Sequence, residues 1–271
     1  QRPQNPQPGD LRFNTDSASL EYFRGDTLGW SQIEMTSPDL GDTTAAATES
    51  AKGTGARAIR AGGQTPSATD IIDYFTISTL GDATSFGSLA SSTRFGGAGG
   101  SSRTRGIFMG GAVPSRLSNI DYITISSTGN STAWGATLST TMATTGASSQ
   151  TRAFTMGGDS PGYINNIEYV TIATTGTRSD FGDMSTQNFE SFRVLASSTR
   201  AVLAGGESPA NLNVMDYVEI GTLGNALDFG DLTANRKGQT GMSSPVRGIY
   251  TGDQNDYNTT SAEFIRIASK G

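Results

Sequence analysis

The sequence predicts an all-β fold built from a repeated unit. Five short hydrophobic segments each begin at an arginine and end in Gly-Gly or a close equivalent, and these arginines follow one another at intervals of 48, 47, 48 and 47 residues. A period of that length with strand-like content is typical of a β-propeller, in which each repeat supplies one blade of four strands. We therefore expect five blades. The five arginines are Arg57, Arg105, Arg152, Arg200 and Arg247.

The second landmark of each repeat is an acidic residue followed by an aromatic one. It opens segments such as DYFTIS and EYVTIA, whose alternating β-branched and aromatic residues are typical of a strand. A binding surface is one interpretation of these pairs. Their periodicity favours another, in which they pack in the core and form hydrogen bonds between blades. The acids are Asp73, Asp121, Glu168, Asp216 and Glu263.

The third landmark is an aromatic residue followed by glycine. A glycine-containing turn separates it from the acid–aromatic strand, and glycine there supplies the positive φ angle that a tight turn requires. Small residues precede each arginine, as in GGAGGSS and TTGASS, which suits an innermost strand at the crowded propeller axis. The aromatic–glycine pairs are Phe86-Gly87, Trp134-Gly135, Phe181-Gly182 and Phe229-Gly230.

No fifth aromatic–glycine pair follows the last acid–aromatic strand. Its counterpart is Leu40-Gly41, whose glycine precedes Arg57 by 16 residues, against 17 or 18 for the corresponding glycines of the other repeats. We therefore expect residues 36–46 to supply the missing strand of the last blade. Such closure leaves only short, protected strand edges. The propeller domain then spans residues 36–271.

Residues 1–35 lie outside the repeat. The first ten are rich in proline and glutamine and lack apolar periodicity, which predicts an extended arm. The segment that follows alternates like a small β-hairpin. Its aromatic residues are of the kind that anchor protein interfaces, so we expect this region to dock on another protein. The candidate docking residues are Phe13, Tyr22, Phe23 and Trp30.

Composition excludes several kinds of chemistry. The chain has no histidine and no cysteine, so it has no Ser-His-Asp or Cys-His nucleophile, no disulfide and no ordinary zinc site. The net charge is −6 with no basic stripe, and no apolar run reaches membrane-spanning length, so we expect neither nucleic-acid binding nor membrane insertion. Carboxylate-dependent glycoside hydrolysis remains an alternative. We expect no enzymatic activity, no cofactor and no metal.

Two features invite functional readings beside their structural ones. The arginines form a positive ring if they face one surface, although strand-start arginines more often bond loop carbonyls or the neighbouring acids. The loops after Gly-Gly vary in sequence on a repeated frame, which suits recognition. One of them carries Tyr163, a side chain suited to stacking on a sugar.

The repeat resembles the kelch repeat, in which hydrophobic residues end in Gly-Gly and a tyrosine stands beside an acid. The motifs (D/E)Y(V/I)TI, FGDL and SSxTR resemble more specifically the kelch-like repeats in structural proteins of tailed phages of the marine type. The resemblance covers roughly residues 36–271. The N-terminal pattern L-R-F-N, E-Y and G-W resembles short β-modules of phage tail and fibre proteins.

This resemblance implies a non-enzymatic virion protein of the tail, a tail fibre or another surface appendage, with other virion proteins as partners. The alternative is an adhesin whose blade loops bind a host surface glycan or protein. Because propellers host many unrelated tasks, the fold itself does not decide between these functions.

Overall fold

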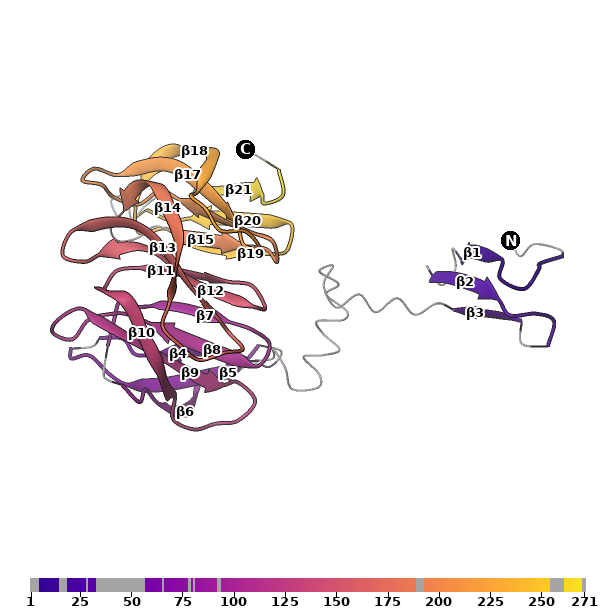
Figure 1. Ribbon diagram of the computed structural model, residues 1–271, viewed down its shortest axis with the longest axis horizontal. Coiled ribbons are helices and arrows are strands. Elements are labelled where there is room, and N and C mark those ends of the chain that lie inside the picture. Colours follow the sequence, from indigo (N-terminus) through magenta and orange to yellow (C-terminus); the bar gives the residue numbers. More distant parts are fainter. Residues whose placement is uncertain are drawn as a thin grey trace. The chain divides into compact units, whose positions relative to one another are not determined.

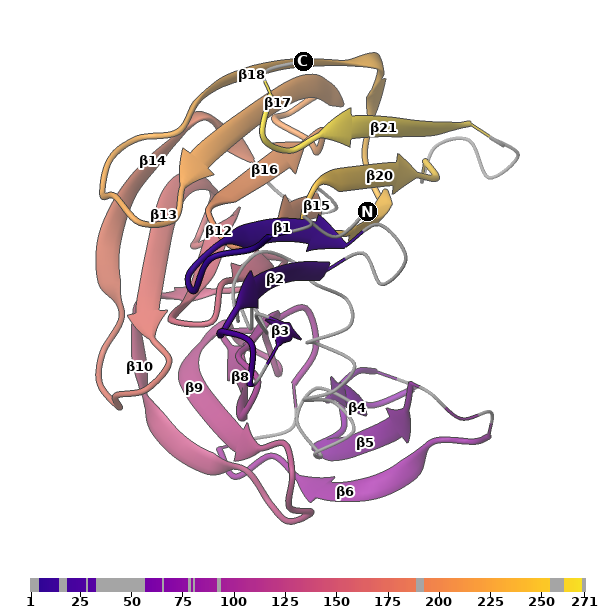
Figure 2. The same ribbon diagram turned by 90° about the vertical axis from the view of Figure 1, so that its right-hand side faces the viewer.

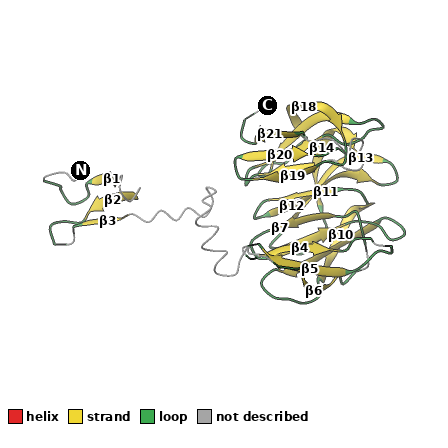
Figure 3. Ribbon diagram, turned by 180° about the vertical axis from the view of Figure 1, so that it is seen from behind, coloured by secondary structure: helices red, strands yellow, loops and turns green. Residues whose placement is uncertain are grey.

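The computed structural model divides the chain into two compact units, residues 1–48 and 49–271. The structure describes residues 5–14, 19–27, 29–32, 57–64, 66–77, 79, 81–91, 94–188, 193–253 and 261–269. The described residues contain strands and turns and no helix (Figure 3), which confirms the predicted all-β class.

The N-terminal unit is a three-stranded antiparallel sheet (Figure 1) in which β2 is the central strand. The predicted hairpin is therefore present, with Leu11 opposite Tyr22, and a third strand joins it. That third strand brings Trp30 opposite Phe23. The strands are β1 (Leu11–Asn14), β2 (Ser19–Phe23) and β3 (Trp30–Gln32).

The second unit contains five antiparallel sheets, one for each sequence repeat. In every sheet the strands follow one another in chain order, and three of the sheets have four strands. The first sheet comprises β4 (Arg57–Ala61), β5 (Ile71–Thr76) and β6 (Thr84–Ser88). The second comprises β7 (Ala98–Ser101), β8 (Arg105–Met109), β9 (Leu117–Thr124) and β10 (Thr132–Thr141).

The remaining sheets repeat this order. The third comprises β11 (Thr145–Ser148), β12 (Arg152–Asp159), β13 (Tyr163–Thr171) and β14 (Ser179–Asn188). The fourth comprises β15 (Arg193–Ala196), β16 (Arg200–Ala204), β17 (Leu212–Glu219) and β18 (Leu227–Arg236). The fifth comprises β19 (Thr240–Ser243), β20 (Arg247–Thr251) and β21 (Ala262–Arg266).

The five sheets follow an arc, with β4–β6 at one end and β19–β21 at the other (Figure 2). The first strands of successive sheets lie side by side, β7 with β11, β11 with β15 and β15 with β19. The expected closing strand, residues 36–46, lies outside the described residues.

The hydrophobic core lies between the sheets. Each cluster of buried residues combines one sheet with the next along the arc. Phe154 and Met156 of the third sheet, for example, pack with Val218 and Ile220 of the fourth. Stability therefore comes from contacts between neighbouring repeats, as in other repeat proteins.

The aromatic–glycine pair owes its place to a β-bulge. In each complete pairing the aromatic residue is the extra one, because its two neighbours pair with consecutive residues of the acid–aromatic strand; Phe181, for example, stands between the partners of Glu168 and Ile167. The bulge turns the ring inward. There it meets the tyrosine of the acid–aromatic pair edge-on, at centroid distances of 5.6–6.0 Å.

The glycine of this pair is needed for a close approach between sheets. A Cβ atom added to Gly87 would lie 2.2 Å from the carbonyl oxygen of Gly129, which belongs to the turn of the next sheet. Gly135 faces Gly176 in the same way, at 2.7 Å, and Gly182 faces Gly224 at 2.5 Å. Each turn also donates a backbone hydrogen bond across the joint, such as Gly129 N to Phe86 O at 2.8 Å.

Candidate functional site

The five repeated arginines stand at the starts of equivalent strands, and four of them join neighbouring sheets. Each of the four donates from Nη1 to the backbone carbonyl of an isoleucine that ends the acid–aromatic segment of the next sheet. The pairs are Arg57 with Ile125 (2.7 Å), Arg105 with Ile172 (2.8 Å), Arg152 with Ile220 (2.6 Å) and Arg200 with Ile267 (3.0 Å).

Each arginine also lies over the aromatic ring of its own sheet's acid–aromatic pair. The distance from the guanidinium carbon to the ring centroid is 4.4–4.8 Å for the four tyrosines and 5.3 Å for Arg247 over Phe264. A guanidinium that stacks on a ring and donates to a carbonyl has a structural role. In these four arginines the guanidinium holds two neighbouring sheets together.

The repeated acids join sheets in a second way. Four of them accept a hydrogen bond from a hydroxyl group of the preceding sheet or of the segment just after it. The hydroxyl-to-carboxylate pairs are Ser91 with Asp121 (2.6 Å), Ser139 with Glu168 (3.5 Å), Ser185 with Asp216 (2.6 Å) and Thr233 with Glu263 (2.7 Å).

The acids also form ion pairs, with arginines other than the repeated ones. Asp121 pairs with Arg94, Glu168 with Arg178 at 2.9 Å, Glu263 with Arg236 at 3.0 Å and Asp73 with Arg60 at 3.6 Å. Arg94 and Arg236 stand at equivalent positions, each 27 residues before its acid, whereas Arg60 and Arg178 belong to the same repeat as their acids. These partners were missed because no arginine recurs at one position in every repeat.

Burial sets the electrostatics of two of these pairs. The Arg178 side chain is fully buried beside Glu168, and burial lowers the pKa of Arg178 to about 10 although the carboxylate opposes the shift. Burial also lowers the pKa of Arg94, again against the effect of Asp121. These side chains are ionised inside the sheet stack because each has an opposite charge beside it.

The loops after Gly-Gly share one backbone frame in four repeats. Residues four apart face each other as a bridge in every one: Gln64 with Ala68, Ala112 with Arg116, Asp159 with Tyr163 and Glu207 with Asn211. The third residue of each loop is a proline. The sequence variation expected there thus falls on a constant turn, with Ala68, Arg116, Tyr163 and Asn211 at equivalent positions.

Ion pairs engage the acids of these loops. Asp159 pairs with Arg116 of the preceding repeat, and Glu207 pairs with Lys237 at 2.7 Å. A catalytic pair for glycoside hydrolysis would be unique to one place in the chain, and Asp159 and Glu207 are among the acids that do not recur in every repeat. In the structure each acid holds a loop in place, and Tyr163, the bridge partner of Asp159, is half-buried.

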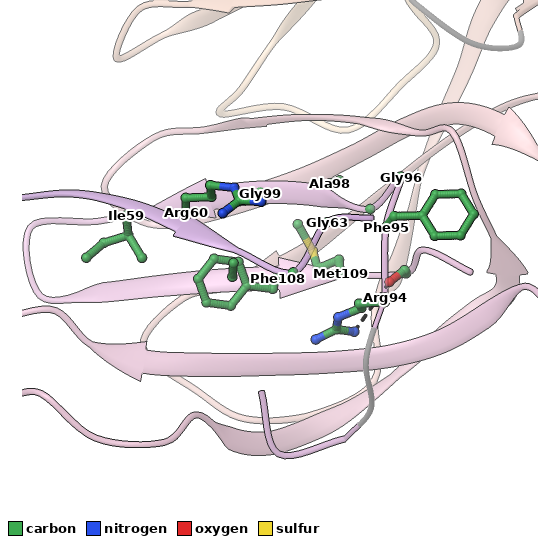
Figure 4. A pocket seen from close by; sticks show the side chains of 14 residues that line it. Ile59, Arg60, Gly63, Arg94, Phe95, Gly96, Ala98, Gly99, Phe108 and Met109 are labelled. Carbon is green, nitrogen blue, oxygen red and sulfur yellow. Dashed lines mark hydrogen bonds between the residues drawn. The ribbon is translucent and has the colours of Figure 1, made fainter. Parts of the chain in front are cut away.

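A cavity of about 320 Å³ lies between the first two sheets (Figure 4). Ile59 and Arg60 line it from β4, and Phe108 and Met109 line it from β8, with glycine backbone between them. In the other four sheets the arginine strand pairs with a preceding strand, whereas among the described residues β4 pairs with β5 alone. The cavity thus lies beside the edge of β4 that has no partner strand among the described residues.

The N-terminal sheet uses two of its four candidate docking residues internally. Phe23 is buried, and its ring lies 5.4 Å from that of Trp30. The guanidinium of Arg12 covers Trp30 at 4.9 Å and pairs with Glu21. Phe13 lies in β1, but its side chain is outside the description.

The exposed part of this small sheet is different from the part expected. Leu11 is 63% exposed, and Tyr22, its partner across the strands, is half-buried. The ring of Phe23 packs inside its own unit, and the docking role of the four candidate residues stays a prediction. Leu11 was overlooked because aliphatic residues in a strand give no signal of their exposure.

The described residues contain no group of three or more acidic side chains placed to hold a metal ion. They also include no helix of the length and hydrophobicity needed to cross a membrane. Comparison with models of known protein families gives no match, and no curated protein sequence matches the chain.

Proposed function

We propose that residues 36–271 form a closed five-bladed β-propeller of the kelch-like kind. The support is the joint between sheets, which recurs four times: a repeated arginine donates to an isoleucine carbonyl of the next sheet at 2.6–3.0 Å. The fifth sheet, β19–β21, has three described strands where three other sheets have four. Residues 36–46 carry Leu40-Gly41, the remaining copy of the outer-strand landmark, and supply the fourth strand of this sheet.

Two deletions test the closure. Removing residues 1–46 takes away the closing strand and should lower the melting temperature or cause aggregation, because it exposes a strand edge. Removing residues 1–35 should leave the melting temperature of the propeller unchanged. Equal melting of the two truncated chains would overturn the assignment of residues 36–46.

We further propose that the chain is a non-enzymatic structural protein of a phage virion, in the tail, a fibre or another surface appendage. The resemblance of the repeat to kelch-like phage proteins supports the virion. The contacts support the structural role, because the repeated arginines and acids are used in joints and the loop acids Asp159 and Glu207 in ion pairs.

The observation that carries the docking role is the separate N-terminal sheet. It has its own small core of Phe23 and Trp30, lies outside the repeat, and exposes Leu11. In this proposal the N-terminal sheet attaches the protein to another virion protein and the propeller faces outward.

Mass spectrometry of purified particles tests this role. The full chain should be found in them, and a chain without residues 1–35 should be lost from them while its propeller still folds. The Leu11→Ser variant should weaken incorporation. The matched control is Leu223→Ser, an equally exposed leucine on a turn of the propeller. Full incorporation of the truncated chain would contradict the docking role.

One observation favours host attachment as a second function. The four loops after Gly-Gly present different side chains from one backbone frame, an arrangement suited to recognising a glycan or a protein. Exchanging Arg116, Tyr163 and Asn211 for alanine should leave incorporation intact and reduce attachment of particles to host cells. Unchanged attachment would contradict the host-attachment function and favour a purely structural role.

A further inference from the structure

The two ends of the sheet array expose residues that are buried at every internal joint. Figure 2 shows the first sheet, β4–β6, and the fifth sheet, β19–β21, at the ends of the arc. The repeat places the same positions on both, so each end face can be compared with its internal copies. The comparison shows which contacts the ends lack.

On the first sheet the uncovered face is the one that looks away from the second. Ile77 is 62% exposed, whereas the isoleucines at its position in the other sheets are at most 5% exposed. Phe75 is 50% exposed, whereas the residues at its position in the next three sheets are at most 4% exposed. At the internal joints these positions pack against the preceding sheet.

On the fifth sheet the uncovered face is the opposite one. Ile249 is 37% exposed, while the residues at its position in the second, third and fourth sheets are fully buried. Met242 is 63% exposed, and Leu195, at its position in the fourth sheet, is buried. Phe264 is 66% exposed and carries Arg247 above its ring. Arg247 is itself exposed, and its guanidinium donates to no acceptor within the described residues.

The uncovered faces of the first and fifth sheets carry the two complementary sides of the joint that links neighbouring sheets elsewhere. We propose that they contact each other within one chain, with Arg247 donating to the backbone carbonyl of Ile77 and Phe75 packing against Phe264 and Ile249. The register supports this pairing, because Ile77 is the residue that corresponds to the four acceptor isoleucines. The inference rests on the closed ring proposed above and names the contact that seals it.

The occupant of each face is the other end of the same chain. A second copy joined end to end could form the same contact, but it depends on protein concentration, whereas two ends of one arc meet at a fixed effective concentration. Figure 2 shows that the arc turns β4–β6 back towards β19–β21. The intramolecular contact is therefore the one to test.

The absence of cysteine from the chain permits a direct test by thiol labelling of the full protein. Three single variants are compared: Ile77→Cys at the end face, Ile125→Cys at the equivalent internal joint, and Leu223→Cys on an exposed turn. If the joint forms, the thiol at position 77 should react about tenfold or more slowly than the thiol at position 223, since labelling then requires local opening. Protection should be the same at all protein concentrations.

A second variant shows whether Arg247 is responsible. Adding Arg247→Ala to Ile77→Cys should return labelling to the rate seen at position 223. Adding Arg105→Ala, at an internal joint, should not. The end contact is refuted if position 77 reacts as fast as position 223, or if Arg247→Ala leaves its protection unchanged. Protection that appears only at high concentration, together with larger species, would assign the faces to a second copy.

These outcomes are separate from those of the proposed function. Suppose that position 77 is labelled fast and that melting depends on residues 36–46. The first result would refute the contact between Arg247 and Ile77, and the second would still support closure by residues 36–46. The presence of the chain in particles is independent of both results.

Discussion

Replacing Glu168 by glutamine should be among the most destabilising single changes in the five-sheet unit. The carboxylate is the only countercharge within 4 Å of the Arg178 guanidinium among the described residues, and the two side chains are 5% and 0% exposed. The terminal nitrogens of Arg178 have no hydrogen-bond partner in the described part of the chain. The Glu168→Gln variant therefore leaves a cation buried without compensation.

The expected cost follows from the burial. Even with Glu168 in place, burial lowers the pKa of Arg178 from the ordinary arginine value to about 10. A shift of this size corresponds to roughly 3 kcal/mol against the charged form. Removing one member of such a pair typically costs about 3–5 kcal/mol. We expect a loss in that range from Glu168→Gln.

Two controls make the measurement specific. The double variant Glu168→Gln with Arg178→Met removes both charges and should recover most of the lost stability. Asp73→Asn removes the acid at the same repeat position in the first sheet, where its partner Arg60 is 66% exposed and 3.6 Å away. That change should cost less than about 1 kcal/mol.

The assay is equilibrium unfolding in urea, followed by circular dichroism at neutral pH. An equal loss of unfolding free energy in Glu168→Gln and Asp73→Asn would contradict the role of burial, as would a double variant no more stable than Glu168→Gln. Alkaline conditions add a check. Because the pKa of Arg178 is lowered on folding, the unfolded chain binds more protons between about pH 10 and the ordinary pKa of arginine. This group therefore favours folding more as the pH rises through that window.

Two further changes probe other joints. Gly87→Ala should cost about 1–3 kcal/mol, because its Cβ atom would lie 2.2 Å from the carbonyl oxygen of Gly129, whereas Gly176→Ala meets open space and should be nearly neutral in a thermal melt. Tyr250→Phe should cost about 1 kcal/mol at pH 7, because the buried hydroxyl donates to Val202 O. Burial raises the pKa of Tyr250, so its contribution is complete below pH 10 and lost as the pH rises above it. The variant should therefore lose less stability than the parent in alkaline unfolding, and an equal loss would contradict this.

The repeat could be predicted from the sequence because its landmarks are side chains. The aromatic residue before Gly87 and the tyrosine of the acid–aromatic pair recur as residue types in the sequence. The structure places their rings edge-on in the core. The acceptors of the repeated arginines could not be predicted in this way. They are backbone carbonyls of residues 67 or 68 positions further on, such as Ile125 for Arg57. Every residue has a backbone carbonyl, so the residue type does not identify the acceptor.

Ion pairs and burial in the small sheet were harder to predict for a different reason. Arg94 and Arg236 reach their acids from equivalent positions, but Arg178 reaches Glu168 from the segment that follows it in the same sheet. An arginine present at one position in only two repeats gives no periodic signal. The burial of Phe23 and the exposure of Leu11 could not be predicted from strand alternation either. Strand alternation assigns residues to two faces, but it does not say which face of a three-stranded sheet is covered.

The acceptor in each arginine joint is a main-chain oxygen, and this has a consequence for how such a chain can change. A joint that recognises a carbonyl does not depend on which side chain the neighbouring repeat carries there. Repeats are therefore interchangeable parts at these joints, and duplicating or exchanging one whole period between equivalent arginines, Arg105 to Arg152 for example, preserves the donor and acceptor of every internal contact. Loop sequences can then diverge repeat by repeat while the assembly rule stays the same.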